Sequence, residues 1–390
     1  MNKICIILSL CGLFLCYTNG LWSQVDIEPG DPANRSDIPA FFKSDLPAIE
    51  EEVSQVNRGE VKVIAHSPGG FPVYAVFYGK KEDFQSRANY NSAIGANDPS
   101  SYARRDRNHK PVVYFLGPVH GQEMEGIVGL VNLIHIAETG VDYRGKEWPS
   151  LKQKLDKCRA IIVPCGNPDG RARCPYDTFL GLPTSVMTKY GQGTHKDGSA
   201  WGYPQAKSLH PMQGDVGILG AYFNDDGINI MHDEFFSPMA QETRAILDLA
   251  RDEAPDLAVS LHSFELVSRI LPVSYIPWFM KEEVQELSRM VNKAYRSNDL
   301  PCYPDGVFGE PSVEDREFPP QTPFNLTGAL HHTSGCLVCT FECSHGSYSK
   351  GTGIQDTNPD ITFEDILDYQ LILYETMLDY SLDQQRAVSQ

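Results

Sequence analysis

The sequence has 390 residues, of which 41% are hydrophobic and 22% are charged. These proportions are ordinary for a folded globular protein and exclude the collagen-like, disordered and coiled-coil classes. The formal net charge is −18 at pH 7, and such an acidic surface repels nucleic-acid phosphates and anionic lipid headgroups. We therefore expect no nucleic-acid or membrane-surface partner, and we expect a small or peptidic molecule as the ligand.

The first residues indicate export. A positive n-region precedes an apolar run from Ile4 to Cys16, and small and polar residues close the segment. This pattern is typical of a secretory signal peptide over residues 1–23, and the run is too short for a comfortable membrane span. We expect a secreted or periplasmic protein with no membrane span after signal removal. An uncleaved signal anchor or a lipid anchor is the less favoured alternative.

Seven of the ten cysteines lie beyond the signal segment. Because seven is an odd number, at least one thiol stays free even in an oxidising compartment. Cys336 and Cys339 have a spacing that zinc sites use, but no second pair with similar spacing accompanies them. We therefore expect no structural zinc there.

The remaining chain is expected to form an arm and one domain. Residues 24–60 are polar with scattered prolines and predict an extended N-terminal arm, followed by a domain over residues 61–390. Hydrophobic patterning predicts strands at 73–78, 111–116, 158–164, 257–261 and 335–343. It predicts helices at 124–137, at 281–295, from Ser237-Pro238 through Arg251, and after a cap at Thr362. Strands and helices alternate from residue 111 onward, which favours an α/β fold with a largely parallel sheet.

A long segment interrupts this alternation. Residues 171–226 are rich in glycine and only weakly periodic. A stretch of this length without regular elements inside a compact domain is normally a functional loop region.

Side chains that suit a metal follow the predicted strand that ends at Leu116. His120 and Glu123 are three residues apart at the junction with the next helix, where both can turn toward one point. Zinc takes such nitrogen and oxygen ligands in a tetrahedral arrangement. The His-x-x-Glu spacing alone is weak, because it also begins at His135 and at His262. The position after a buried strand selects His120 and Glu123.

His262 ends another apolar strand, and ligand sites in α/β sheets gather at the carboxyl ends of strands. Together with His120 and Glu123 it would complete three protein ligands and leave one position for water, as in catalytic zinc sites. The alternative for His262 is a hydrogen-bonded core histidine.

Glu342 interrupts an apolar strand, where an unpaired carboxylate would cost several kcal/mol. One interpretation is a general base for amide hydrolysis beside a metal-activated water. The other is a structural ion pair with an arginine such as Arg244 or Arg269. The residues alone leave both open.

These motifs, in this order, resemble the zinc carboxypeptidase superfamily. The matching runs are His120-Gly-Gln-Glu123, Asn167-Pro-Asp-Gly170, Leu261-His262-Ser263 and Thr340-Phe341-Glu342. The resemblance extends from about residue 61 to 380. It implies a three-layer α/β/α sandwich around a mixed, mostly parallel sheet of about eight strands. It also implies one zinc ion held by His120, Glu123 and His262, with Glu342 as the general base.

The chain departs from the family where C-terminal carboxylates are bound. The run Gly227-Ile-Asn-Ile-Met-His-Asp233 replaces the family's Gly-Val-Asp-x-Asn-Arg-Asn, so His232 stands in place of an arginine. That change loses a bidentate carboxylate contact. We expect Arg173, His232 and Asn229 to contact the substrate, and we slightly prefer Arg171 as the arginine that polarises the scissile carbonyl.

The resemblance implies a secreted zinc-dependent metallopeptidase that hydrolyses peptide or peptide-like amide bonds. A zinc-dependent N-acyl amino acid deacylase of the aspartoacylase type is one alternative, since it shares the His-Gly-x-Glu and later His pattern. A non-catalytic, metal-retaining binding protein is another, because the carboxylate-binding arginine is missing. The Asn-Pro-Asp-Gly turn and the signal peptide favour the peptidase. The sequence indicates neither the side-chain preference nor the oligomeric state.

Overall fold

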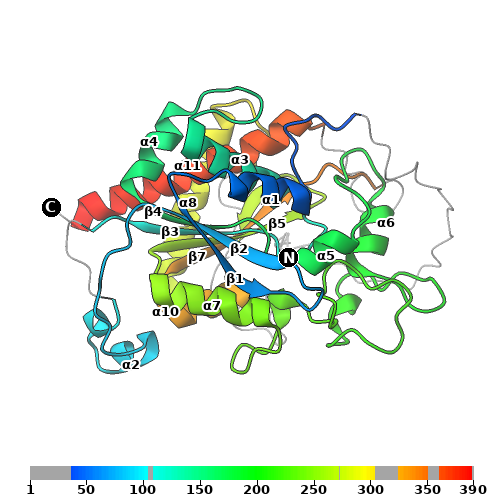
Figure 1. The fold of residues 1–390 in the computed structure, drawn as a ribbon, viewed down its shortest axis with the longest axis horizontal. Helices are drawn as coiled ribbons and strands as arrows, with labels where there is room; N and C mark the ends of the chain where they lie inside the picture. Colours follow the sequence, from blue (N-terminus) through cyan, green and yellow to red (C-terminus); the bar gives the residue numbers. More distant parts are fainter. Residues whose placement is uncertain (1–36, 104–108, 272, 304–323, 350–359, 389–390) are drawn as a thin grey trace, which may run out of the picture.

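The computed structural model describes residues 37–103, 109–271, 273–303, 324–349 and 360–388 (Figure 1). The expected signal segment and the first part of the expected arm lie outside these residues. None of the described helices combines the length and the apolar character needed to cross a membrane.

A mixed sheet of seven strands forms the centre of the described chain, in the order β1-β2-β4-β3-β5-β7-β6. The strands are β1 (Glu60–His66), β2 (Pro72–Tyr78), β3 (Val112–Leu116), β4 (Arg159–Val163), β5 (Leu257–Phe264), β6 (Arg269–Leu271) and β7 (Leu337–Ser344). β4, β3, β5 and β7 pair in parallel, whereas β2 and β6 run antiparallel to their neighbours. The sheet is therefore mostly parallel, as expected, with seven strands where about eight were expected.

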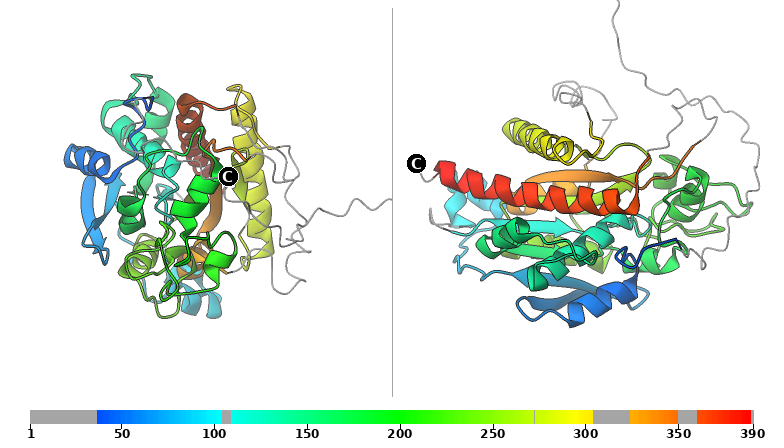
Figure 2. Two further views of the ribbon diagram at one scale, coloured as in Figure 1. Left: turned by 90° about the vertical axis from the view of Figure 1, so that its right-hand side faces the viewer. Right: turned by 90° about the horizontal axis from the view of Figure 1, so that it is seen from above.

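Helices cover both faces of this sheet (Figures 1 and 2). One face carries α1 (Leu46–Ser54), α3 (Glu125–Thr139), α4 (Pro149–Lys157), α8 (Trp278–Arg296) and α11 (Phe363–Val388). The other carries α7 (Gln241–Glu253) and α10 (Leu326–Ser334). The short helices α2 (Tyr90–Gly95), α5 (Pro168–Arg173) and α6 (Thr184–Met187) lie in the connections. This is the expected three-layer α/β/α sandwich.

The central strand β3 shows why its sequence favours a buried position. All five of its residues are buried. Val113 and Phe115 belong to the apolar core beneath α3 and α11, while Tyr114 and Leu116 belong to the core beneath α7 and α10. A strand covered on both faces needs a continuous apolar run rather than an alternating one, and this strand has such a run.

The arm differs from its expected extended form, because residues 46–54 form helix α1. The Asp45 carboxylate accepts a hydrogen bond from the Ala48 N–H at 2.8 Å and caps the helix. Ile49 and Val53 are buried in the core that α1 shares with α3. Apolar burial of this kind outweighs the polar composition that suggested an extended arm.

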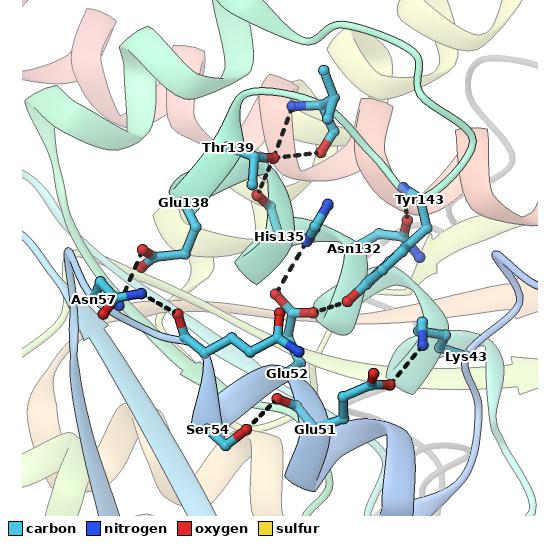
Figure 3. Close-up of polar contacts among 12 residues, drawn as sticks. Lys43, Glu51, Glu52, Ser54, Asn57, Asn132, His135, Glu138, Thr139 and Tyr143 are labelled. Atoms are coloured by element: carbon cyan, nitrogen blue, oxygen red, sulfur yellow. Dashed lines mark hydrogen bonds and ion pairs between the residues drawn. The ribbon is translucent and has the colours of Figure 1, made fainter.

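Polar contacts among Glu52, His135 and Tyr143 connect α1 to α3 (Figure 3). The Glu52 carboxylate is 2% exposed, accepts a hydrogen bond from the Tyr143 hydroxyl and lies 3.5 Å from His135 Nδ1. The His135 ring stacks on the Tyr143 ring at 4.1 Å. Burial raises the pKa of Glu52, although its contacts with Tyr143 and His135 act to lower it. These contacts compensate a buried carboxyl group, so the last part of the arm belongs to the folded domain.

Helix α7 begins later than its sequence predicted. Ser237 does not cap it, and the helix starts at Gln241. The Asp233 carboxylate accepts hydrogen bonds from the N–H groups of Met239 and Ala240 at 3.2 and 3.0 Å. Asp233 therefore holds the preceding segment in a turn, and the prediction of a start at Ser237 was wrong.

Candidate metal centre

The carboxyl ends of β3, β5 and β7 lie at one edge of the sheet because these strands are parallel. His120 and Glu123 lie in the loop that joins β3 to α3, His262 lies near the end of β5, and Glu342 lies near the end of β7. The topology thus brings together residues that are up to 222 positions apart in the chain.

Two imidazoles converge on one carboxylate at this edge. His120 Nδ1 lies 2.9 Å from Glu123 Oε1, and His262 Nδ1 lies 2.8 Å from Glu123 Oε2. All three side chains are buried, and their ligand atoms lie within 4.8 Å of one another. Among the described residues this is the one group of three or more His, Cys, Asp or Glu side chains that could hold a metal ion.

Neighbouring side chains fix the orientation of the three residues. The Ser260 hydroxyl contacts His262 Nε2 at 3.0 Å, and Gln122 Nε2 donates to Glu123 Oε1 at 3.3 Å. The His120 ring stacks on the Tyr222 ring at 4.0 Å with 18° between the planes. Outer contacts of this kind preorganise metal ligands.

The donor set fits a zinc ion. Zinc takes imidazole nitrogen and carboxylate oxygen at about 2.0–2.1 Å, so its tetrahedral ligand atoms lie about 3.3 Å apart. The two shortest nitrogen–oxygen separations here are within 0.5 Å of that value. Burial acts to raise the pKa of Glu123, but the charges and hydrogen bonds of His120 and His262 outweigh it and lower the pKa to about 2. A buried carboxylate that stays ionised between two imidazoles is suited to a cation.

Glu342 lies beside this group. It is the register partner of His262 on β5 and of Arg269 on β6, so the three side chains share one face of the sheet. Burial raises the pKa of Glu342 to about 7, although the charges of His262 and Arg269 act to lower it. Within the described chain Glu342 has no ion pair with Arg244 or Arg269, so the structure does not show the structural ion pair that the sequence left open.

The guanidinium of Arg171 is buried and forms hydrogen bonds with other groups of the protein. Its Nε donates to the Ser44 carbonyl at 2.8 Å, its Nη1 donates to the Cys174 carbonyl at 3.1 Å, and its Nη2 pairs with Asp177. The side chain is 3% exposed. These contacts use the guanidinium to join the arm to the segment after α5, which argues against the expected polarising role.

Arg173 is engaged in a different way. Its guanidinium donates to the carbonyls of Leu219, Gly220 and Phe223 and pairs with Asp225. It therefore holds the turn that carries Tyr222, the residue stacked on His120. This placement favours a positioning role over the expected substrate contact.

Asn229 and His232 lie at the two ends of a short turn. Asn229 Oδ1 accepts from the Met231 N–H at 3.0 Å, and its buried Nδ2 has no hydrogen-bond partner in the described part of the chain. Burial, together with the charges of Lys207, His120 and His262, lowers the pKa of His232 to about 2. His232 is therefore neutral at neutral pH.

Sequence reasoning missed Tyr222 and Lys207. Both lie in the long segment that was expected to be functional, but no motif distinguishes them within it. Burial lowers the pKa of His120 and of His232, and the charge of Lys207 acts in the same direction. The effect of the Lys207 charge on these imidazoles depends on how the loop packs, which the sequence pattern does not predict.

The seven cysteines beyond the predicted signal segment are free thiols, and all but Cys302 are buried. Burial raises the pKa of Cys339 to about 12. Among the described residues, Cys336 and Cys339 are not part of the candidate metal group.

Comparison with known proteins finds a family profile and solved structures that this chain resembles. The sequence profile of the zinc carboxypeptidase family matches residues 50–197. Carboxypeptidase A from Helicoverpa armigera is similar in structure, with 12% identity, a TM-score of 0.51, and 91% of this chain and 78% of that chain covered. Bovine thrombin-activatable fibrinolysis inhibitor, in complex with tick carboxypeptidase inhibitor, has 13% identity and a TM-score of 0.50, with 89% and 100% covered. None of the curated proteins matches this sequence. The profile match covers less than half of the chain, and the solved structures show that the chain shares a carboxypeptidase-like fold.

Proposed function

We propose that this protein is an exported zinc-dependent metallopeptidase that hydrolyses peptide or peptide-like amide bonds. The observation that carries the proposal is the position of Glu342 beside the buried group of His120, Glu123 and His262. A protein that only bound a ligand would have no need of a buried carboxyl group next to a metal site, because burying it costs free energy. Export through residues 1–23 is part of the proposal.

His120, Glu123 and His262 would hold the zinc ion, which supplies a Lewis acid for the scissile carbonyl and makes water more acidic. Glu342 accepts the proton of the attacking water at a carboxylate oxygen and returns it to the nitrogen of the leaving amine. A carboxyl group whose pKa is about 7 can do both near neutral pH. Ser260, through its contact with His262, keeps the ligand in place during these proton transfers.

A second candidate is a metal-retaining binding protein without catalysis. The observation that favours it is that Arg171 and Arg173 are both held by backbone carbonyls and by Asp177 or Asp225. Neither guanidinium is therefore placed to stabilise an oxyanion. An enzyme with this arrangement must obtain that stabilisation from the metal or from another side chain.

Digestion of a peptide library separates these candidates. The full chain, loaded with zinc, is incubated with the peptides and with a panel of N-acyl amino acids, and the products are read by mass spectrometry. We expect peptide cleavage that a chelator abolishes and added zinc restores. Cleavage confined to N-acyl amino acids would replace the peptidase by a deacylase. Zinc binding without hydrolysis of any compound would support the binding protein.

A further inference from the structure

His120 lacks the hydrogen bond that usually fixes a metal-binding imidazole. Its Nδ1 faces Glu123 Oε1 at 2.9 Å, so Nδ1 is the ring nitrogen on the side of the metal. The other ring nitrogen, Nε2, is buried and has no hydrogen-bond partner among the residues that the structure describes. In most metal sites this second nitrogen donates to a carboxylate, a backbone carbonyl or a water. His262 has such a contact, because its Nε2 lies 3.0 Å from the Ser260 hydroxyl.

The ring of Tyr222 covers one face of the His120 imidazole. The two ring centres lie 4.0 Å apart with 18° between the planes, and Tyr222 is 8% exposed. A close, nearly parallel neighbour restricts the tilt of the imidazole, because buried side chains leave little free space between them. An imidazole that gives its lone pair to a metal ion becomes more positive, and the face of a tyrosine ring attracts a positive group. The stack therefore favours the metal-bound form of His120.

The turn that carries Tyr222 is joined to the loop that carries His120. The Gly121 N–H donates to the Ala221 carbonyl at 2.8 Å, and the Tyr222 N–H donates to the Gly191 carbonyl at 2.9 Å. Tyr222 also belongs to a small buried apolar cluster with Ala206, Met212 and Phe223. Backbone hydrogen bonds and apolar packing together keep the Tyr222 ring against the imidazole.

Arg173 restrains the same turn. Its guanidinium donates to three backbone carbonyls and pairs with one carboxylate, those of Leu219, Gly220, Phe223 and Asp225. A planar guanidinium presents its donors in a rigid fork, so it fixes the positions of several acceptors relative to one another. The bonded carbonyls precede and follow Tyr222 in the chain, so Arg173 restrains the backbone on both sides of the stacked ring.

We propose that Tyr222 is the positioning residue that orients His120 for the metal, in place of the missing hydrogen bond, and that Arg173 acts through Tyr222. This inference rests on the metal site of the proposed function. The long loop segment over residues 171–226 then contributes to zinc affinity, although within the described chain none of its side chains belongs to the candidate metal group. Because coupling between two equilibria is reciprocal, zinc binding also stabilises the turn that carries Tyr222.

Zinc affinity, measured by competition with a chromogenic chelator, tests the role of the ring. Tyr222→Phe keeps the ring and should bind zinc within about 3-fold of wild type. Tyr222→Leu removes the ring and should bind zinc about 10- to 100-fold more weakly, the range for losing an outer contact of a metal ligand. Equal zinc affinity in wild type and Tyr222→Leu would overturn the proposal.

The matched control is Tyr143→Leu. The Tyr143 ring stacks on His135 at 4.1 Å, also with 18° between the planes, and His135 lies near the C-terminal end of α3 (Figure 3). This variant should lose stability but keep the zinc affinity of wild type. A loss of zinc affinity in Tyr143→Leu as large as that in Tyr222→Leu would mean that any lost stack weakens zinc binding, and it would overturn the specific role of Tyr222.

Arg173→Met tests the connection through the turn. It should weaken zinc binding about 3- to 10-fold, and adding it to Tyr222→Leu should cause little further loss, because residues that act through one contact are not additive. Fully additive losses of zinc affinity in the double variant would contradict the action of Arg173 through Tyr222.

Hydrogen exchange gives a measurement on wild type that does not depend on the folding of a variant. Zinc should slow the exchange of the Tyr222 N–H group by about 10-fold or more, because metal binding and the packing of the turn are coupled. The His195 N–H, which donates to the Ser199 carbonyl in the same segment, is the reference and should not respond. Exchange at Tyr222 that is the same with and without zinc would overturn the proposal even if Tyr222→Leu does not fold.

The failure of this proposal can be distinguished from the failure of the proposed function. If wild type binds zinc but hydrolyses no compound, the metallopeptidase assignment fails, while the zinc affinities of the variants still decide the role of Tyr222. If wild type hydrolyses peptides and Tyr222→Leu keeps full zinc affinity, the assignment stands and the positioning role of Tyr222 fails.

Discussion

His262 and Glu342 are register partners on the adjacent parallel strands β5 and β7. The separation of a candidate metal ligand and a candidate base is therefore set by strand pairing rather than by a loop. Side chains directly opposite on neighbouring strands lie on the same face about 5 Å apart at their Cβ atoms. Sites on such rigid elements keep their geometry more precisely than sites on loops, which suits a reaction that transfers a proton between fixed positions.

This pairing leads to the first prediction. Glu342→Gln should still bind zinc, because the three candidate ligands are untouched, but kcat/KM for peptides should fall about 10²- to 10⁴-fold through the loss of the base. Metal content by mass spectrometry and turnover of a cleaved library peptide measure the two effects separately. Glu265→Gln is the matched control, since Glu265 lies near enough for its charge to act on Glu342, and it should lose little activity. Normal turnover in Glu342→Gln would exclude this residue as the base.

The second prediction concerns the metal. A chelator should lower the midpoint of thermal unfolding, and zinc should restore it, because a ligand that binds only the native state stabilises that state. His120→Ala should bind less than one zinc per chain, and its midpoint should no longer respond to the chelator. His195→Ala provides the control, because His195 pairs with Asp215 in a solvent-exposed contact. A full zinc content in His120→Ala would contradict the assigned site.

The third prediction tests the close approach of Gly121, in the His-Gly-Gln-Glu motif, to the backbone of Gly170 and Arg171. A Cβ atom added at Gly121 would lie 2.1 Å from the backbone nitrogen of Arg171 and 2.1 Å from the backbone carbon of Gly170. Gly121→Ala must therefore move the loop that carries His120, and we expect a loss of about 3 kcal/mol in unfolding free energy together with weaker zinc binding. Urea titration and zinc content measure both. Gly95→Ala, where nothing lies within 4 Å of the added atom, should change the stability by less than about 1 kcal/mol.

The positions of the candidate ligands were predictable because they depend on strand ends. His120 follows one buried strand, and His262 and Glu342 lie near the ends of two others, so a parallel sheet must bring them to one edge. The cap at Thr362 was also predictable, since it depends on local contacts: its hydroxyl accepts from the Asp365 N–H at 3.1 Å. Helix caps and the positions of strand ends can therefore be predicted from a single sequence.

Contacts between distant segments were not predictable in the same way. Nothing near Arg171 in the sequence indicates that its guanidinium binds the carbonyl of Ser44, 127 residues earlier. The stacking of Tyr222 on His120 joins residues on two loops whose path follows no repeating pattern. The late start of α7 has a similar cause, because the Asp233 carboxylate accepts hydrogen bonds from the N–H groups of Met239 and Ala240, which precede the helix. In each case a specific tertiary hydrogen bond or ring contact decided the outcome.

The fourth prediction is a pH dependence of stability. Glu242 is fully buried, and burial raises its pKa to about 7 from an ordinary value of 4.5. A carboxyl group with a raised pKa in the folded state favours the protonated form, so it destabilises the protein increasingly as the pH rises from about 4.5 to about 7, and by a constant amount above that. Glu242→Gln keeps an acceptor for Asn224 and removes this cost. The unfolding free energy of Glu242→Gln should be about 3 kcal/mol higher than that of wild type at pH 8, and the two should differ little at pH 4.5.

Urea denaturation of both proteins at several pH values checks this difference, in which the contributions of all other titrating groups cancel. Glu282→Gln serves as the control, because Glu282 is exposed on α8. A constant gap between Glu242→Gln and wild type from pH 4.5 to 8 would contradict the effect of burial on Glu242.

The last prediction distinguishes the two roles considered for Arg171. If its guanidinium polarised the substrate carbonyl, Arg171→Met would lower kcat and leave the stability nearly unchanged. The contacts with Ser44, Cys174 and Asp177 predict instead a loss of about 2–4 kcal/mol in unfolding free energy, because several buried hydrogen bonds lose their donor. The turnover of the folded fraction should then fall less than about 10-fold. Arg251→Met is the reference, since Arg251 forms an exposed ion pair with Asp248, and it should cost less than about 1 kcal/mol. A stable Arg171→Met variant with strongly reduced kcat would restore the catalytic role, and it would mean that the guanidinium leaves this network when substrate binds.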